Sequence, residues 1–198
     1  MSKTRLGIMA SGGGSNADAI LQSCADGKLN ATGAVIISNN KDAGVHNVAK
    51  KHNVPSYHIS RDMFRDGRQF ADKLINIFRE HQVDLILLAG YMRKLPPALI
   101  RSWRNAVLNI HPALLPAHGG KGMYGIRVHE DVLAKGDKET GVTIHFVDEE
   151  YDRGPILHQV GGVPVYPNDT PEKIAARVLE VEHRAYCEAV QIWMDKHN

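Results

Sequence analysis

Asn109 and His111 have the residue types and the spacing that acyl-transfer chemistry needs. They alternate with Ile110 at the end of the apolar run 106–110, so in a strand their side chains project to the same side. An amide can donate a hydrogen bond to a developing oxyanion, and an imidazole beside it can carry a proton. Pro112 favours an extended backbone at His111. An ordinary hydrogen-bonded histidine at a strand end would show the same pattern, so both interpretations stay open here.

The segments around these two residues limit the kind of acyl transfer. The stretch 109–116 contains no serine or cysteine, so a covalent acyl-enzyme is not expected. A carboxylate that orients His111 would complete the site, and the segment 145–157 offers Asp148, Glu149, Glu150 and Asp152. Composition does not choose among them, and a solvated acidic turn would look the same.

A glycine-rich segment, "SGGGSNA" at 11–17, follows an apolar run and precedes a helical pattern. Backbone N–H groups and a helix dipole hold an anion at such a place, and Ser15 and Asn16 add side-chain donors, so we expect a phosphate there. The segment also fits the loose G-x-G-x-x-A dinucleotide pattern. However, the next apolar run ends in "SNNK" at 38–41, without the acidic residue that NAD binding needs. A tight turn without a ligand is the remaining alternative.

Short apolar runs and amphipathic segments indicate the elements that position these residues. We expect strands at 5–10, 32–38, 55–60, 84–90, 106–110, 140–147 and 155–165, and helices at 16–25, 43–52, 68–81, 96–103, 128–136 and 171–196. Repeated strand–helix units predict an α/β fold with an open, mostly parallel, twisted sheet and helices on both faces. The stronger alternation in the last two strands predicts that they are antiparallel or at an edge. Ligands of such sheets bind at the carboxyl ends of the strands, which selects 11–16, 90–95, 109–125 and 148–154.

Length, composition and charge exclude several classes of protein. A chain of 198 residues predicts one domain, and the 43% hydrophobic and 23% charged residues are typical of a soluble globular protein. No apolar stretch reaches the roughly 20 residues of a membrane span, and the start of the chain lacks the apolar core of a signal peptide, so we expect a cytoplasmic protein. The net charge of +2 comes from interspersed signs, which disfavours a nucleic-acid partner. Cys24 and Cys187 lie far apart and are expected to be reduced, and no histidine or cysteine spacing predicts a metal site.

Five motifs in one order resemble a known family. They are "SGGGSN" (11–16), "LAGYMRKL" (88–95), "NIHPALLP" (109–116), "GVTIHFVDEEYDRGPIL" (141–157) and "EVEHRAY" (180–186). Together they resemble the phosphoribosylglycinamide formyltransferases, and the resemblance covers nearly the whole chain. It implies a single domain over 1–198 with a Rossmann-like formyltransferase fold. The N-terminal half would bind the phosphate, and the C-terminal half would carry the folate-binding and catalytic loops.

The family transfers a formyl group from 10-formyltetrahydrofolate to the glycine amine of glycinamide ribonucleotide, so the resemblance implies these two small molecules as substrates. It also implies roles for residues. The implied catalytic set is Asn109, His111 and Asp152, and it is the resemblance that selects Asp152 from its acidic neighbours. The implied contacts to the ribonucleotide are Gly14, Ser15 and Asn16 at the phosphate and Glu182 at the ribose. The implied folate site consists of Arg68, Met92, Arg93, Lys94, Leu95, Asn109, Asp148, Glu149, Glu150, Tyr151 and Asp152, with no metal.

Two departures from the family pattern and several alternatives remain. Ala113 stands where the family often has serine, and the loop 117–129 is longer than in some members, with Lys121 and Arg127 as candidates to reach the phosphate.

A formyltetrahydrofolate deformylase would share the catalytic residues and use water as acceptor. Deformylases usually carry an additional amino-terminal domain and methionyl-tRNA formyltransferases a carboxyl-terminal one, so a chain of this extent is expected to be neither. A non-catalytic nucleotide- or folate-binding module is a further alternative, and we expect a monomer or a weak homodimer.

Overall fold

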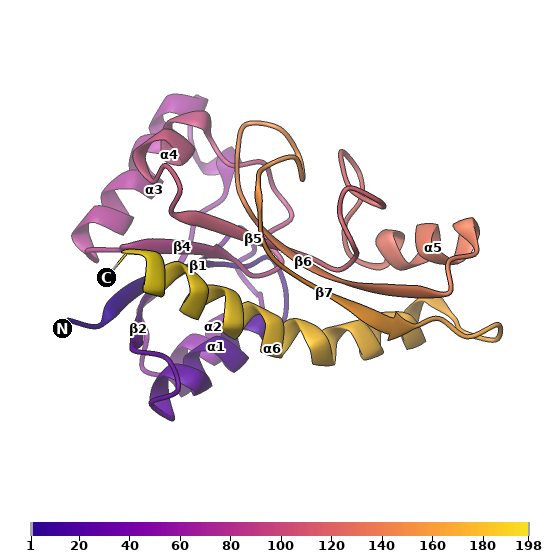
Figure 1. The fold of residues 1–198 in the computed structure, drawn as a ribbon. Helices are drawn as coiled ribbons and strands as arrows, with labels where there is room; N and C mark the ends of the chain where they lie inside the picture. Colours follow the sequence, from indigo (N-terminus) through magenta and orange to yellow (C-terminus); the bar gives the residue numbers. More distant parts are fainter. Residues whose placement is uncertain (1, 198) are drawn as a thin grey trace. The chain divides into compact units, whose positions relative to one another are not determined.

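The computed structural model describes residues 2–197. The chain divides into two compact units, one that ends at Leu108 and one that begins at Asn109. Within the described residues, seven strands follow the order β3-β2-β1-β4-β5-β6-β7 (Figure 1). The order of elements confirms the predicted α/β fold. No helix among residues 2–197 is long and apolar enough to cross a bilayer.

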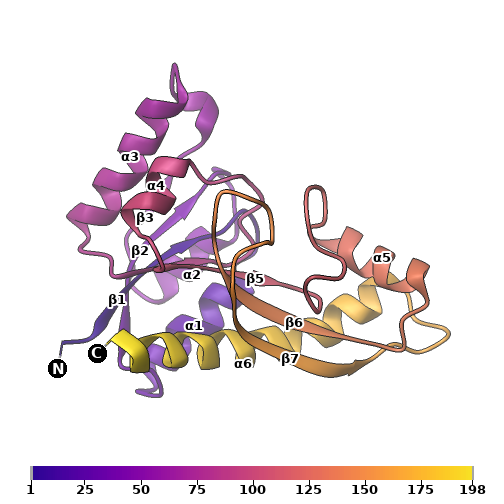
Figure 2. The ribbon, with the colours of Figure 1, turned by 45° about the horizontal axis from the view of Figure 1, so that its top comes forward.

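The first unit is a parallel sheet with helices on both faces. Its strands are β1 (Thr4–Met9), β2 (Ala31–Ser38), β3 (Ser56–His58) and β4 (Leu85–Leu88), and its helices are α1 (Ser15–Ala25), α2 (Val45–Lys51), the 3-10 helix η1 (Arg61–Met63), α3 (Gly67–Glu80) and α4 (Pro97–Ser102). The strand pairs β1–β2, β1–β4 and β2–β3 are all parallel. Figures 1 and 2 show α1 and α2 on one face and α3 and α4 on the other. All four residues of β4 are buried, because helices cover the sheet on both sides.

The second unit contains an antiparallel pair of strands with a long helix along it. The strand β5 (Val107–His111) starts at the end of the first unit, and α5 (Ile126–Lys135), β6 (Glu139–Phe146), β7 (Ile156–Pro164) and α6 (Pro171–His197) follow. β6 and β7 pair antiparallel, as their alternation predicted, and α6 packs against both strands and against α5 (Figure 2). Val178, Tyr186 and Val190 of α6 are fully buried in this core.

Most predicted bounds differ from the observed ones by one or two residues, and one short element was not predicted. The strand predicted at 106–110 extends one residue further, so His111 belongs to β5 itself and not to the loop after it. α5 begins at Ile126 and not at residue 128. The short η1 was not predicted, because three residues are too few to show a helical period.

Candidate active site

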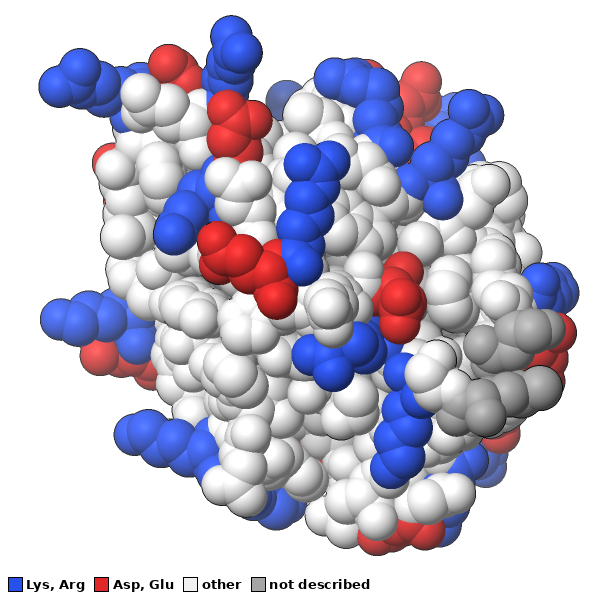
Figure 3. Space-filling view, turned by 90° about the vertical axis from the view of Figure 1, so that its left-hand side faces the viewer, with Lys and Arg blue, Asp and Glu red and all other residues white. Residues whose placement is uncertain are grey.

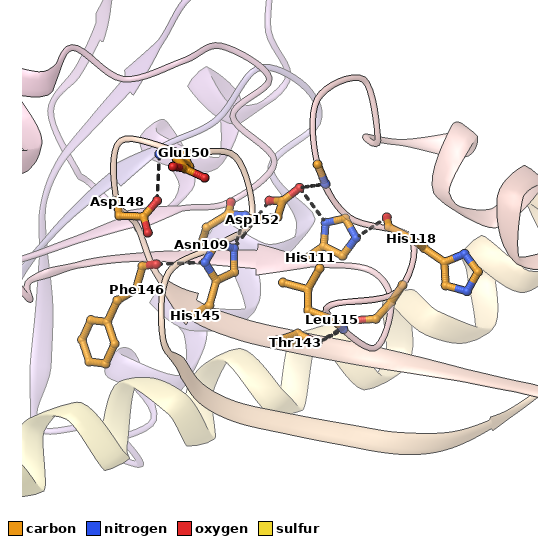
Figure 4. Close-up of polar contacts among 12 residues, drawn as sticks. Asn109, His111, Leu115, His118, Thr143, His145, Phe146, Asp148, Glu150 and Asp152 are labelled. Carbon is orange, nitrogen blue, oxygen red and sulfur yellow. Dashed lines mark hydrogen bonds and ion pairs between the residues drawn. The ribbon is translucent and has the colours of Figure 1, made fainter.

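The end of β5 places Asn109 and His111 on the same side of the second unit. Ile110 between them is buried in the opposite direction, as strand alternation requires. His111 is only 3% exposed, whereas Asn109 is half-buried. In Figure 4, Asp152 lies between the two side chains, on the loop that joins β6 to β7. The structure therefore brings together the three residues that the resemblance marks as catalytic.

The hydrogen bond at one ring nitrogen of His111 fixes the tautomer of the imidazole. Its Nε2–H donates to the backbone carbonyl of His118 at 2.9 Å. Because a carbonyl only accepts, Nε2 carries the proton in the neutral ring. Nδ1 is then the atom that can take up a second proton, and it lies 3.8 Å from Oδ2 of Asp152.

Burial and the neighbouring charges determine the protonation states of this pair. Burial lowers the pKa of His111 below its usual 6.5, and the carboxylate of Asp152 only partly offsets that effect. Burial alone would raise the pKa of Asp152. The neighbouring ring of His145, the charge that His111 acquires on protonation and the Gly120 N–H together hold the pKa of Asp152 below its usual value. At neutral pH the site therefore holds a neutral imidazole beside an ionised carboxylate.

Two glycines bring the backbone of the 117–125 loop against Asp152. The N–H of Gly120 donates to Oδ2 of Asp152 at 2.9 Å, and Asp152 itself has a positive φ of 55°. A Cβ on Gly119 would collide with the side chain of Leu115 and would lie 3.4 Å from Cβ of Asp152. A side chain at position 119 would therefore have to displace Leu115. Sequence reasoning found the glycines but not this role.

His145 is a member of the site that sequence reasoning placed only on a strand. Its Nδ1–H donates to the carbonyl of Phe146 at 2.9 Å, so its Nε2 is an acceptor, and it accepts from Nδ2 of Asn109 at 3.0 Å (Figure 4). This pair of bonds orients the Asn109 amide with its NH₂ group toward His145. The same Nε2 lies 3.6 Å from Oδ1 of Asp152. The available signal was the alternation of Thr143 and His145 along β6, which puts both on one side.

Thr143 fixes the backbone that follows His111. Its hydroxyl donates to the carbonyl of Ala113 at 2.7 Å and accepts from the N–H of Leu115 at 3.0 Å. The side-chain amide of Gln159 donates to the same hydroxyl oxygen at 2.8 Å. Ala113, where the family often has serine, is fully buried in this segment. The same amide of Gln159 donates to the carbonyl of Leu115 at 3.1 Å, so the loop after β5 is attached to β6 through Thr143 and to β7 through Gln159.

In the first unit, the glycine-rich loop lies at the carboxyl end of β1. Gly14 has a φ of 81° just before α1, and a Cβ there would lie 2.7 Å from Val45, so only glycine fits. Ser15 is exposed in the first turn of α1, and Asn16 is buried. A pocket of about 580 Å³ adjoins the loop. It is lined by Ser11, Gly12, Gly13, Asn39, Asn40, Lys41, Asp42, Ala43, Gly44, His58, Ser60, Asp62 and Met63.

The residues expected at the folate site occur in both units. In the first unit Met92 donates its N–H to Oγ of Ser11 at 2.8 Å, which joins the 92–95 segment to the glycine-rich loop. Met92, Arg93 and Lys94 are exposed, Leu95 is buried, and Arg68 is an exposed residue of α3. In the second unit Asp148 accepts the N–H of Glu150 at 2.8 Å, and Glu149 and Tyr151 are exposed. Glu182, which was expected at the ribose of the ribonucleotide and not at the folate, is buried on α6.

Comparison with known proteins identifies the family. The model of a family described as formyl transferase matches residues 4–190. This chain belongs to the formyl transferase family. It is 44% identical over 190 residues to a chloroplastic phosphoribosylglycinamide formyltransferase of Arabidopsis thaliana, with 95% of this chain and 64% of that protein covered. The chain thus spans less than two thirds of that plant relative.

Two bacterial proteins match over more of their own length. The phosphoribosylglycinamide formyltransferase of Escherichia coli strain K12 is 34% identical over 179 residues, with 90% of this chain and 82% of that protein covered. A crystal structure of the Bacillus halodurans phosphoribosylglycinamide formyltransferase has a TM-score of 0.90 and 34% identity, with 98% of this chain and 97% of that chain covered. The fold of this formyl transferase is therefore that of solved phosphoribosylglycinamide formyltransferases.

The second unit of this formyl transferase contains the groups that a direct acyl transfer needs. The Asn109 amide has N–H groups that can donate to an oxyanion, Nδ1 of His111 can exchange a proton, and the Asp152 carboxylate lies where it can stabilise an imidazolium. Among residues 2–197, no group of three or more histidine, cysteine, aspartate and glutamate side chains is placed to hold a metal ion.

Proposed function

We propose that this formyl transferase moves the formyl group of 10-formyltetrahydrofolate to the glycine amine of glycinamide ribonucleotide, a step of purine biosynthesis. One observation in the site carries the proposal: Nε2 of His111 is occupied by a carbonyl, and Nδ1 faces the ionised Asp152 next to the Asn109 amide. The names of the plant and bacterial relatives support the choice of substrates.

The geometry supports a direct transfer with one proton carrier. The neutral amine forms a bond to the formyl carbon, and the carbonyl electrons move to oxygen, where Nδ2–H of Asn109 donates to the oxyanion. The attacking nitrogen then gives a proton to Nδ1 of His111, and Asp152 stabilises the imidazolium. The imidazolium returns that proton to N10 of the folate as the bond between N10 and the formyl carbon breaks. Formylated ribonucleotide and tetrahydrofolate leave, and His111 is neutral again.

The binding assignments are also proposals. Both units would serve this one reaction as a single formyltransferase domain. Gly14, Ser15 and Asn16 hold the substrate phosphate, and the buried Glu182 binds the ribose. The folate site takes Arg68, the segment 92–95, Asn109 and the segment 148–152. The exposed side chain of Met92 offers apolar surface to a flat pterin.

The remaining proposals concern partners and compartment. The substrates are small molecules, no metal takes part, and the protein acts as a monomer or weak homodimer in the cytoplasm. On the face shown in Figure 3, acidic side chains lie among the basic ones, which supports a small-molecule enzyme over a nucleic-acid-binding protein. Sedimentation analysis would test the oligomeric state, and cell fractionation would test the compartment.

A single assay tests the proposed reaction. Purified protein is mixed with 10-formyltetrahydrofolate, and tetrahydrofolate release is followed with and without glycinamide ribonucleotide. Release that depends on the ribonucleotide is the expected result. Release at the same rate without it would identify a deformylase and overturn the proposal. Ligand binding with no turnover in either arm would identify a non-catalytic binding module.

A further inference from the structure

His118 is a buried histidine with a carboxylate at each ring nitrogen. Nδ1 lies 2.6 Å from Oδ2 of Asp131, Nε2 lies 2.6 Å from Oδ2 of Asp137, and the side chain is 6% exposed. Ionised carboxylates only accept hydrogen bonds, so both nitrogens must donate, and the ring must be an imidazolium. Asp131 belongs to α5 and Asp137 follows the end of that helix. His118 is therefore attached both to α5 and to the residue that follows its C-cap.

Lys135 is a further member of this cluster and helps to keep Asp131 ionised. Nζ of Lys135 lies 2.8 Å from the same Oδ2 of Asp131. The Lys135 hydrogen bond, and after it the bond from His118, lower the pKa of Asp131. The charged groups thus alternate in sign around His118, and Asp131 stays ionised across the neutral range.

The backbone of the same segment holds both members of the catalytic pair. The carbonyl of His118 accepts from Nε2–H of His111, and the N–H of Gly120 donates to Asp152. Figure 4 shows the His118 carbonyl turned toward His111 and its ring turned away. His118 also has a φ of 56°, a conformation that is unfavourable for a residue with a Cβ. The two ion pairs of its ring oppose that cost and keep the carbonyl in place.

We propose that His118, Asp131 and Asp137 form a positioning clamp for the catalytic pair. The clamp holds the His118 carbonyl against His111, which keeps the His111 proton on Nε2 and leaves Nδ1 as the basic atom beside Asp152. None of the three clamp residues touches the reacting atoms, and they act through His111. The effect on turnover rests on the proposed formyl transfer, but the tautomer of His111 is a property of the protein alone.

The first test needs no variant and no substrate. Nitrogen-15 NMR of the histidine rings in the intact wild-type protein at pH 7 should show His111 as the neutral Nε2–H tautomer and His118 with both nitrogens protonated. A His111 with its proton on Nδ1, or a neutral His118, would overturn the clamp. This result stands whether or not the protein transfers formyl groups.

The second test compares variants in turnover. His118→Ala should lower kcat by roughly 10- to 100-fold with little change in KM, because His111 loses its fixed position and tautomer. Asp137→Asn keeps an oxygen acceptor for Nε2–H of His118 and should retain most of kcat. The matched control is His158→Ala, which breaks a 2.9 Å histidine–carboxylate pair with Glu188 elsewhere in the same unit and should leave kcat unchanged.

Outcomes of the two tests separate the possible failures. A folded His118→Ala protein with wild-type kcat and an unchanged His111 tautomer would contradict the clamp. A kcat loss shared equally with His158→Ala would reveal a general loss of stability and contradict it as well. Absence of formyl transfer in the wild type would count against the proposed function only, and the NMR result would still decide the clamp. If His118→Ala does not fold, the nitrogen-15 spectrum of the wild-type protein alone tests the clamp.

Discussion

At the scale of single residues, the chemistry of the site depends on which nitrogen of His111 is available. A strand-end histidine with both ring nitrogens bonded to the protein could not exchange a proton with a substrate. In His111 only Nε2 is bonded in this way, to the His118 carbonyl. Nδ1 faces Asp152, and burial keeps the ring neutral at rest. The imidazole can therefore accept a proton and is stabilised by a carboxylate once it has done so.

Replacing His111 should remove the proton carrier. His111→Ala should lower kcat by about 10²–10⁴, because proton transfer to and from the reacting nitrogens then depends on water. Steady-state kinetics with both substrates measure the effect, with His158→Ala as control. Turnover within a few-fold of wild type would refute the role of His111.

Asn109 should stabilise the transition state in addition to lining the folate site. Asn109→Ala removes the NH₂ group that His145 orients, and kcat should fall by roughly 10²–10³ because the oxyanion loses a donor. KM for the ribonucleotide should change little. A variant with normal kcat and a raised KM would show that the amide serves only in binding.

Sequence reasoning reached some of these residues and not others for a physical reason. The two-residue period of a strand was enough to pair Asn109 with His111. Asp152 was selected only by resemblance, because its three acidic neighbours have the same chemistry and only the fold decides which one faces the imidazole. His145 and His118 act through contacts between distant parts of the chain, which no local pattern reveals.

At the scale of elements, the loop 117–125 and the antiparallel pair β6–β7 position the proposed catalytic residues. Thr143 of β6 attaches the backbone after His111, and Gly120 of the loop holds Asp152. The elements themselves were predicted to within one or two residues, because apolar periodicity is local information. How the loop 117–125 runs could not be predicted, since it has no period and is held by side chains far along the chain.

The close approach of the loop can be tested at Gly119. In Gly119→Ala the new methyl group collides with the end of the buried Leu115 side chain, and we expect this clash to displace the loop that donates the Gly120 N–H to Asp152. We expect a loss of about 1–3 kcal/mol in the free energy of unfolding, together with a lower kcat. Urea unfolding and kinetics measure the two effects. In the control Gly161→Ala the added Cβ lies 3.7 Å from Leu114, an ordinary contact, and both quantities should stay near wild type.

The buried His129 of α5 should make stability depend on pH. Burial is the main cause that lowers its pKa from 6.5 to about 4. In this window the unfolded chain binds the proton more tightly than the folded one, so the free energy of unfolding falls as the pH drops from about 6.5 to 4, by about 3 kcal/mol in all. Urea unfolding of wild type and His129→Leu at pH 7 and at pH 4 measures the difference. His129→Leu should lose clearly less stability than wild type over this range, and parallel losses would contradict the assignment.

At the scale of the whole molecule, the order of strands and helices was the most predictable feature. Repeated strand–helix units lead to a parallel sheet, and the alternation in 140–147 and 155–165 correctly indicated an antiparallel pair. The division into two compact units at Leu108 was not predicted, because β5 continues through it without any change in composition. The family model nevertheless covers both units, from residue 4 to residue 190.

The most direct measurement follows the formyl group itself. The protein is incubated with 10-formyltetrahydrofolate labelled with carbon-13 in the formyl group and with glycinamide ribonucleotide, and the fate of the label is observed by NMR. The account predicts that the label appears in a new amide of the ribonucleotide, and that His111→Ala slows its appearance by about 10²–10⁴. Label that appears as free formate in the wild-type reaction, with the ribonucleotide unchanged, would contradict it.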